Sequence, residues 1–107
     1  MKKLLNDIVA AAEAKSAQNI VVLNVRNASR SIDFIVIMSA ESRPQLRAIV
    51  RAIAEKLKRK IKWEGEMESG WLILDLGSIV VHVMDEEERA YYNLEELWGP
   101  EAVVYHI

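Results

Sequence analysis

The amino-acid sequence predicts an α/β fold of the α+β type, in which flanking helices pack against a mixed β-sheet of about five strands. Three observations support this prediction. After a first helical segment, the apolar pattern runs strand, strand, helix, strand, strand. Such an order favours one sheet covered by helices. The 107 residues contain no internal repeat and no linker rich in Gly, Pro or Ser, so residues 1–107 are expected to form a single domain.

The composition is that of an ordinary globular protein, and it excludes several kinds of functional site. Apolar residues make up 51% of the chain and charged residues 28%. The absence of cysteine excludes a disulfide framework, a thiolate metal site and a cysteine nucleophile. His82 and His106 are the only histidines, which is too few for a histidine-rich metal site. We therefore expect neither a metal nor another cofactor.

The sequence contains no signal for a membrane or for secretion. No apolar run approaches the roughly 20 residues that a membrane-spanning helix needs. The first seven residues soon become charged and lack the apolar stretch and cleavage site of a signal peptide. A cytoplasmic protein without a membrane partner is therefore expected.

The first third of the chain predicts one helix and two buried strands. Apolar residues recur every three or four positions from Lys3 to Ala17, which is typical of an amphipathic helix. Ile20–Val25 and Asp33–Met38 are rich in β-branched residues and predict strands that are buried on both faces. The polar segment Asn27–Ser31 between them predicts a turn.

A second amphipathic helix is predicted to begin after Ser42. The Ser42 side chain can cap the helix, Gln45 occupies the reciprocal position of a capping box, and Pro44 is tolerated in the first turn. The apolar stripe of this helix consists of Leu46, Ile49, Val50, Ile53 and Leu57. Most of its Arg and Lys residues are expected to face outward.

Two strands, Trp71–Leu76 and Ile79–Met84, predict a β-hairpin. The two residues between them are Gly77 and Ser78, and a glycine at the first loop position indicates a type II′ turn. This turn sets the register of the hairpin. The pairs are then Leu76 with Ile79, Asp75 with Val80, Leu74 with Val81, Ile73 with His82, Leu72 with Val83, and Trp71 with Met84.

Opposed residues share a face of the hairpin, so the register divides the side chains into two sets. The expected core face is wholly apolar and contains Leu72, Leu74, Leu76, Ile79, Val81 and Val83. The second face contains Trp71, Ile73, Asp75, Val80, His82 and Met84. On this second face Asp75 and His82 are diagonal neighbours, with backbones roughly 7–8 Å apart and side chains that could meet.

Three interpretations of the second face remain open. A further helical layer covers it, and Asp75 and His82 form a structural hydrogen bond. Alternatively, it is a protein-docking surface anchored by Trp71, since aromatic anchors dominate the energetics of interfaces. The third interpretation is an active site with His82 as a base that Asp75 orients. It is weaker, because no Ser or Cys nucleophile and no pair of carboxylates on adjacent strands accompanies the two residues.

The last third of the chain predicts a helix and an edge strand. Asp85 is expected to cap a helix whose acidic first turn is favourable against the helix dipole. We expect this helix to continue through Trp98 and to end at Gly99–Pro100. Tyr92 and Trp98 suit core positions better than contacts. The tail Ala102–Ile107 could add an edge strand.

Charge is strongly segregated along the chain, although the net charge is only -2. Residues 43–62 contain eight basic residues and one acid, whereas residues 64–101 contain eleven acids and one base. An isoelectric point near 5.7 argues against a general nucleic-acid-binding protein. The acidic half suits a basic protein partner. Glu95 and Glu96 are the better candidates for contacts with its Lys or Arg residues.

The hairpin and the residues after it resemble a known family. The segment from Gly70 to His82 reads G-W-L-I-L-D-L-G-S-I-V-V-H, and it is followed by Arg89, by Tyr92-Asn93-Leu94-Glu95 and by Leu97-Trp98. This combination resembles the Iojap family, whose bacterial members are called ribosomal silencing factor, RsfS. The resemblance covers nearly the whole chain, from the first helix to Trp98.

The resemblance implies a binding protein and not an enzyme. Members of the family bind the large ribosomal subunit through its protein fourteen, block joining of the small subunit and thereby reduce translation. Their fold resembles nucleotidyltransferases without the catalytic carboxylates. The family interface would map onto Trp71, Asp75, His82, Tyr92, Glu95 and Trp98. No small-molecule substrate and at most incidental contact with ribosomal RNA are implied.

Two further hypotheses stay open at the level of sequence. The chain could be a small hydrolase or nucleotidyltransferase-like enzyme that uses Asp75 and His82. It could also form a homodimer through the exposed hairpin face, which is compatible with ribosome binding because a dimer could store the docking surface.

Overall fold

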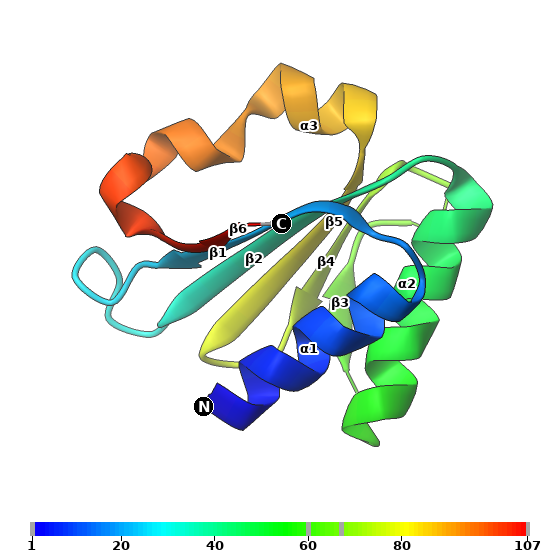
Figure 1. Ribbon diagram of the computed structural model, residues 1–107, viewed down its shortest axis with the longest axis horizontal. Helices are drawn as coiled ribbons and strands as arrows, with labels where there is room; N and C mark the ends of the chain where they lie inside the picture. Colours follow the sequence, from blue (N-terminus) through cyan, green and yellow to red (C-terminus); the bar gives the residue numbers. More distant parts are fainter. Residues whose placement is uncertain (1, 60, 67, 107) are drawn as a thin grey trace.

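The computed structural model describes residues 2–59, 61–66 and 68–106, and in these residues a six-stranded sheet lies between two groups of helices (Figure 1). Helices α1 and α2 cover one face of the sheet, and α3 with two short 3-10 helices arches over the other. The elements are α1 (Lys2–Ala14), β1 (Gln18–Asn24), β2 (Phe34–Ala40), α2 (Arg43–Leu57), β3 (Lys62–Glu64), β4 (Trp71–Asp75), β5 (Ile79–Asp85), α3 (Glu86–Tyr92), η1 (Leu94–Leu97), η2 (Pro100–Ala102) and β6 (Val103–His106). The predicted α+β fold is confirmed.

The sheet contains one strand more than the prediction of about five. The additional strand is β3, which pairs antiparallel with β4 and places Lys62 opposite Asp75. A strand of three residues, two of them charged, is too short to show an alternating pattern. It is defined by its pairing with β4, which the sequence of the segment does not reveal.

The strand order explains why β2 is wholly buried. The order is β3-β4-β5-β2-β1-β6, with β2 and β5 parallel and the other neighbours antiparallel. Strand β2 therefore has neighbours on both sides and helical layers over both faces. All of its seven residues are buried, as expected for its continuous apolar sequence.

The hairpin register is confirmed in the structure. Trp71 lies opposite Met84, Ile73 opposite His82, and Asp75 opposite Val80. Beside the turn, the Leu76 amide donates to the Ile79 carbonyl at 2.9 Å. The predicted core face is buried throughout and consists of Leu72, Leu74, Leu76, Ile79, Val81 and Val83. These side chains pack beneath α1 and α2 in the main hydrophobic core.

Helix α2 begins as predicted, but Gln45 does more than close a capping box. The Ser42 hydroxyl accepts a hydrogen bond from the Gln45 amide at 3.1 Å. The Gln45 side-chain oxygen accepts from the amide of Glu41, where a capping box would use that of Ser42. Its amide nitrogen donates to the carbonyls of Lys15 and Ser16, both at 3.0 Å. One side chain thus joins the start of α2 to the end of α1.

The first helix is shorter than predicted. The prediction extended it to Ala17, whereas α1 ends at Ala14. Ser16 adopts a left-handed conformation with a φ of 61°, and the Ala17 amide donates back to the Ala12 carbonyl at 3.1 Å. This local reversal ends the helix and lets β1 begin at Gln18.

The helix predicted to run through Trp98 is interrupted. Helix α3 ends at Tyr92, because Asn93 adopts the left-handed conformation (φ 43°, ψ 57°) and its amide donates to the Arg89 carbonyl at 2.9 Å. Asparagine tolerates this conformation better than most residues. The chain continues as the 3-10 helix η1 (Leu94–Leu97). We call the segment from α3 to η2, residues 86–102, the arch, because it bends over the sheet and does not project from it.

The tail forms an edge strand, as predicted. Strand β6 (Val103–His106) pairs antiparallel with β1, and Val22 lies opposite Tyr105. Ile107, the last residue of the predicted strand, lies outside the described residues. Over the described ranges, the helices are too short and too polar for any of them to cross a bilayer.

We predict that Gly70→Ala destabilises the protein more than Gly77→Ala. Both glycines have a positive φ (80° and 86°), where a Cβ costs about 1–2 kcal/mol. A Cβ on Gly70 would also lie 2.3 Å from Asp85 Oδ2, whereas one on Gly77 meets nothing within 4 Å. The clash should add about 1–3 kcal/mol to the loss of unfolding free energy, measured by urea denaturation. Equal losses in the two variants would contradict this.

Candidate functional site

The second face of the hairpin is covered in one part and open in another. A smaller hydrophobic cluster lies between the sheet and the arch and contains Val21, Leu23, Val25, Ile35, Ile37 and Met84. Leu94, Trp98 and Ala102 of the arch pack against this cluster. The interpretation of a covering layer is therefore correct for the β1–β2 side of the sheet. Trp71 packs at the edge of the cluster and remains partly exposed.

Trp71, His82 and Tyr92 form a contiguous aromatic group where the arch leaves the sheet. The indole Nε1 of Trp71 donates to His82 Nδ1 at 3.1 Å. The ring centroids of Trp71 and Tyr92 lie 4.8 Å apart, and Tyr91 meets Tyr92 edge to face at 4.9 Å. Tyr92 is 50% exposed and Tyr91 is 81% exposed. We call Trp71, Tyr91 and Tyr92 the aromatic surface.

His82 is held in its neutral form. Burial disfavours its positive charge and lowers its pKa from 6.5 to about 4. A neutral imidazole has one acceptor and one donor nitrogen, and here Nδ1 is the acceptor for Trp71. The histidine therefore orients the indole of Trp71, and its other nitrogen carries the ring proton.

Asp75 and His82 do not pair, so the contact that the sequence left open between their side chains is not formed. The Asp75 carboxylate accepts a hydrogen bond from the Gly77 amide at 2.9 Å and is exposed. Both residues lie in the described part of the chain, and the structure shows no hydrogen bond or ion pair between them. An enzyme that used Asp75 to orient His82 as a base would need that contact. The geometry thus offers no support for the hydrolase or nucleotidyltransferase hypothesis.

Glu95 is engaged within the molecule. Its Oε2 accepts from Nη2 of Arg89 at 2.9 Å and from Nε at 3.3 Å. Arg89 Nη1 donates to the Ser39 hydroxyl at 2.9 Å and to the Asn19 carbonyl. The Arg89 side chain is only 11% exposed. Arg89 therefore fastens the arch to β1 and β2, and Glu95 is its counter-ion.

Arg89 is the site residue that sequence reasoning undervalued. It belongs to the motif quoted for the family, but no functional role follows from that position alone. The available signal is its isolation, because it is the single base among eleven acids in residues 64–101. A lone cation in such a segment indicates an internal ion pair. Trp98, in contrast, lies where a core position was expected and packs against the cluster under the arch.

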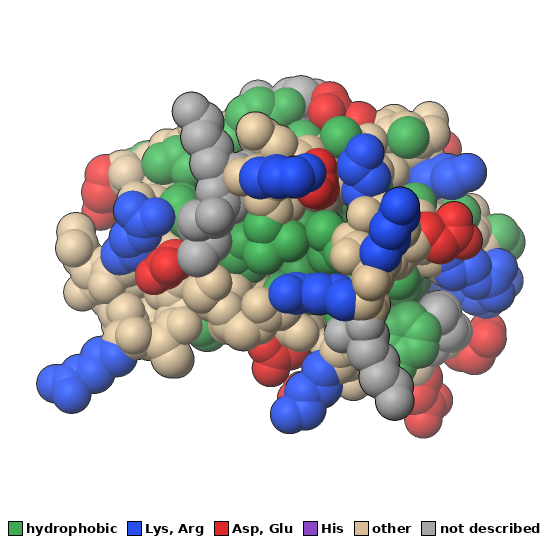
Figure 2. All heavy atoms as spheres, turned by 90° about the horizontal axis from the view of Figure 1, so that it is seen from below, with side chains coloured by type: hydrophobic (Ala, Val, Ile, Leu, Met, Phe, Trp, Pro, Cys, Tyr) green, Lys and Arg blue, Asp and Glu red, His purple; other side chains and the backbone are tan. Residues whose placement is uncertain are grey.

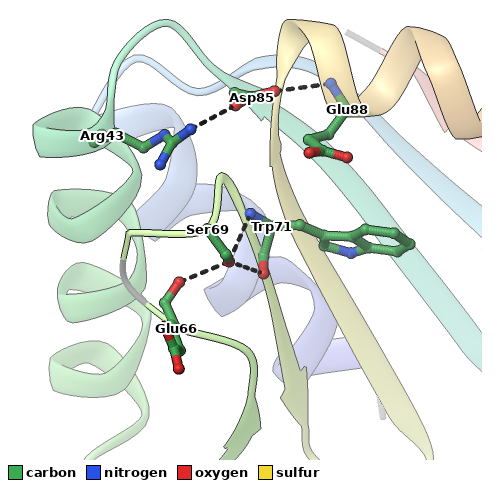
Figure 3. A network of polar contacts seen from close by, with 6 residues as sticks. All are labelled: Arg43, Glu66, Ser69, Trp71, Asp85 and Glu88. Atoms are coloured by element: carbon green, nitrogen blue, oxygen red, sulfur yellow. Dashed lines mark hydrogen bonds and ion pairs between the residues drawn. The ribbon is translucent and has the colours of Figure 1, made fainter.

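A polar network holds the backbone on either side of Trp71 (Figure 3). The Ser69 hydroxyl lies 2.7 Å from the Glu66 carbonyl and 2.9 Å from the Trp71 carbonyl. As the cap of α3, Asp85 accepts a hydrogen bond from the Glu88 amide through its Oδ1, at 2.8 Å. Its Oδ2 forms an ion pair with Nη2 of Arg43 at 3.6 Å. These contacts join the start of β4, the end of β5 and α2 to the base of α3.

The opposite side of the molecule is formed by α1 and α2 and carries much of the positive charge. Figure 2 shows Lys and Arg side chains around an apolar centre, with acidic side chains among them. Nη1 of Arg47 forms an ion pair with Oε1 of Glu68 at 3.5 Å, and Nη2 of Arg59 donates a hydrogen bond to the Leu76 carbonyl at 3.3 Å. Arg47 and Arg59, two of the eight basic residues in the segment 43–62, therefore make contacts within the molecule. No group of residues that could hold a metal ion occurs in the described ranges.

These features define an α+β domain whose sheet carries a partly open aromatic surface on an acidic segment. The family model described as "Ribosomal silencing factor during starvation" (RsfS) matches residues 1–106. The chain belongs to this family of ribosomal silencing factors.

Known relatives are similar over most of the chain. A protein of Halalkalibacterium halodurans named ribosomal silencing factor RsfS is 40% identical over 102 residues, which cover 92% of this chain and 87% of the relative. A mouse protein named mitochondrial assembly of ribosomal large subunit protein 1 is 34% identical over 98 residues, covering 85% and 43% respectively. The crystal structure of protein CV0518 from Chromobacterium violaceum has a TM-score of 0.86 at 29% identity and covers 92% of this chain and 86% of that one. The name ribosomal silencing factor denotes a regulatory protein and not an enzyme.

We predict that His82→Gln removes a component of the pH dependence of stability. Between pH 6.5 and 4 the unfolded chain protonates this histidine and the folded chain does not, so stability falls as the pH falls through this range. The component is on the order of 3 kcal/mol. Urea unfolding at several pH values would measure it, and His106→Gln controls for the loss of a histidine as such. An unchanged slope in His82→Gln would contradict the prediction.

Arg89→Lys is predicted to lower the free energy of unfolding by about 2 kcal/mol, because lysine cannot reach Glu95, Ser39 and Asn19 together. The matched control is Arg30→Lys, at an exposed arginine in the loop between β1 and β2. Urea denaturation of both variants would measure the difference. Equal stability of the two would show that Arg89 does not fasten the arch.

Proposed function

We propose that this protein binds the large ribosomal subunit through ribosomal protein fourteen and sterically blocks joining of the small subunit. The observation that carries the proposal is the aromatic surface, which stands open on an acidic segment of a chain that belongs to the ribosomal silencing factor family. The name of the mouse relative, which refers to assembly of the ribosomal large subunit, supports the choice of subunit.

The aromatic surface has the physical properties of a docking site. Tyr91 and Tyr92 are exposed, and exposed aromatic side chains supply large contact areas at low cost in side-chain entropy. The surrounding segment, residues 64–101, carries eleven acids and one base. A basic ribosomal protein is complementary to such a segment, and this complementarity favours rapid and specific association.

The six residues carried over from the family divide into two roles in this proposal. Trp71, Tyr92 and the exposed carboxylate of Asp75 contact the partner. The remaining three residues hold the surface in place. His82 orients the indole of Trp71, Glu95 pairs with Arg89, and Trp98 packs against the hydrophobic cluster under the arch.

Repression by this protein is steric, because one surface of the large subunit serves both the protein and the small subunit. Inhibition of subunit joining then follows the occupancy of the large subunit. Ribosomal subunits of bacteria join in the cytoplasm, and we place the protein there.

We expect the purified protein to sediment with the large subunit and not with the small one, and to reduce the fraction of joined ribosomes. Trp71→Ala combined with Asp75→Ala should weaken binding by roughly 30-fold, which is the effect of losing an anchor worth about 2 kcal/mol. Trp63→Ala is the control, since Trp63 is 48% exposed on edge strand β3. Urea denaturation would show which variants are folded.

Unchanged binding of the double variant would overturn the role of the aromatic surface. Failure of the wild type to sediment with the large subunit would overturn the proposed function as a whole. Concentration-dependent self-association without ribosome binding would favour the homodimer.

A further inference from the structure

We propose that a hollow beside the aromatic surface receives a basic side chain, an arginine or a lysine, of the protein partner. This inference rests on the proposed function and names the chemistry of the contact. The hollow has a volume of about 350 Å³. Its walls include two aromatic rings, those of Trp71 and Tyr92, and two acidic residues, Glu64 and Glu88, beside the backbone at Gly65.

The two acidic residues come from different elements and line the same hollow. Glu64 is the last residue of β3, and Glu88 lies in the first turn of α3. In Figure 3 the Glu88 side chain points from α3 back toward the strand that carries Trp71. Glu64 and Glu88 are 24 residues apart in the sequence. The pairing of β3 with β4 and the cap of α3 at Asp85 bring them to the same hollow.

Both carboxylates are available to a partner. Within the described ranges, the side chains of Glu64 and Glu88 make no hydrogen bond or ion pair. Other acids of the same segment are engaged: Glu95 with Arg89, and Glu68 with Arg47. Among the acids of this segment that have no ion pair in the described residues, Glu64 and Glu88 are distinguished by lining a hollow beside two aromatic residues.

The combination of aromatic rings and carboxylates selects a cation. A guanidinium or ammonium group is attracted to the face of an indole or phenol ring, and it pairs with carboxylates at the same time. An apolar side chain in the hollow would remove water from two carboxylates without replacing their hydrogen bonds, which is unfavourable. The space is sufficient for a long side chain, since a water molecule in the liquid occupies about 30 Å³.

The floor of the hollow is held by close packing and hydrogen bonds. Gly65 approaches the next strand so closely that a Cβ on it would lie 2.6 Å from the Trp71 carbonyl oxygen. The Ser69 hydroxyl holds that same carbonyl at 2.9 Å. The indole is oriented by His82. A preformed site of this kind loses little conformational freedom when a side chain enters it.

The experiment compares Glu64→Gln combined with Glu88→Gln against Glu87→Gln combined with Glu101→Gln. The control pair removes the same charge from exposed positions of the same acidic segment. Binding to the large subunit is measured by sedimentation at several salt concentrations. We expect the first pair to lose at least tenfold in affinity and to show a weaker dependence on salt, and the control pair to lose less than threefold.

A second measurement uses a small probe and does not depend on ribosome binding. N-acetyl-arginine amide and N-acetyl-lysine amide are titrated into the wild type while the indole N–H signal of Trp71 is followed by NMR, with uncharged N-acetyl-citrulline amide as the reference. We expect a saturable shift with a cationic probe in the millimolar range, absent with citrulline and absent in the Glu64→Gln, Glu88→Gln variant. The stronger probe identifies the preferred side chain.

The outcomes separate this inference from the proposed function. If the wild type binds the large subunit and the double variant Glu64→Gln, Glu88→Gln binds equally well, the proposed role of the hollow is wrong. The proposed function is then unaffected. Equal losses in both pairs also overturn the role of the hollow, because the effect is then one of overall charge. If the wild type does not bind the subunit, the proposed function fails, and the titration with the amides decides whether the hollow binds cations.

Discussion

The guanidinium of Arg89 is the interaction on which the C-terminal third of the fold depends. It joins the carboxylate of Glu95 in the arch to the Ser39 hydroxyl of β2 and the Asn19 carbonyl of β1. A planar group with five donors is suited to such a junction, and at 11% exposure its ion pair is screened little by water. The arch contains 3-10 turns and no long helix, so its position over the sheet depends on this junction and on Leu94, Trp98 and Ala102.

Once the arch is in place, a single sheet face serves two purposes. Over β1 and β2 it is closed and forms a small second core. Toward β4 it is open, and Trp71 lies at the boundary, where it donates to His82 and packs against the tilted ring of Tyr92. The left-handed Asn93 turns the chain at this boundary, so the exposed tyrosines fall before the turn and the covering residues fall after it. Packing and the proposed docking surface therefore share one face of the sheet, and Trp71 belongs to both.

The same division holds for charge. Eleven acids in residues 64–101 suggest a uniform acidic surface, but in the structure these acids have different surroundings. Asp85 caps α3, and Glu95 neutralises Arg89, which are structural roles. Glu64 and Glu88 stand beside the aromatic rings without internal partners among the described residues, which is the arrangement that we propose as a site for a cation. The number of acids thus overstates the charge that is exposed, because some of these carboxylates have partners within the fold.

The sequence by itself determined the features that depend on local geometry. A two-residue turn at Gly77 and an alternation of period two set the register of β4 and β5 and both of their faces, and the Ser42 and Asp85 caps follow from neighbouring residues. The family was also recognisable from the motif between Gly70 and Trp98. Tertiary structure decided the rest. Strand β3 exists through its pairing with β4, and Asp75 turns to the Gly77 amide while His82 takes the indole of Trp71. The roles of Arg89 and Glu95, and the placement of Glu64 and Glu88 at the same hollow, depend on contacts between residues up to 70 positions apart, which no local pattern of side chains specifies.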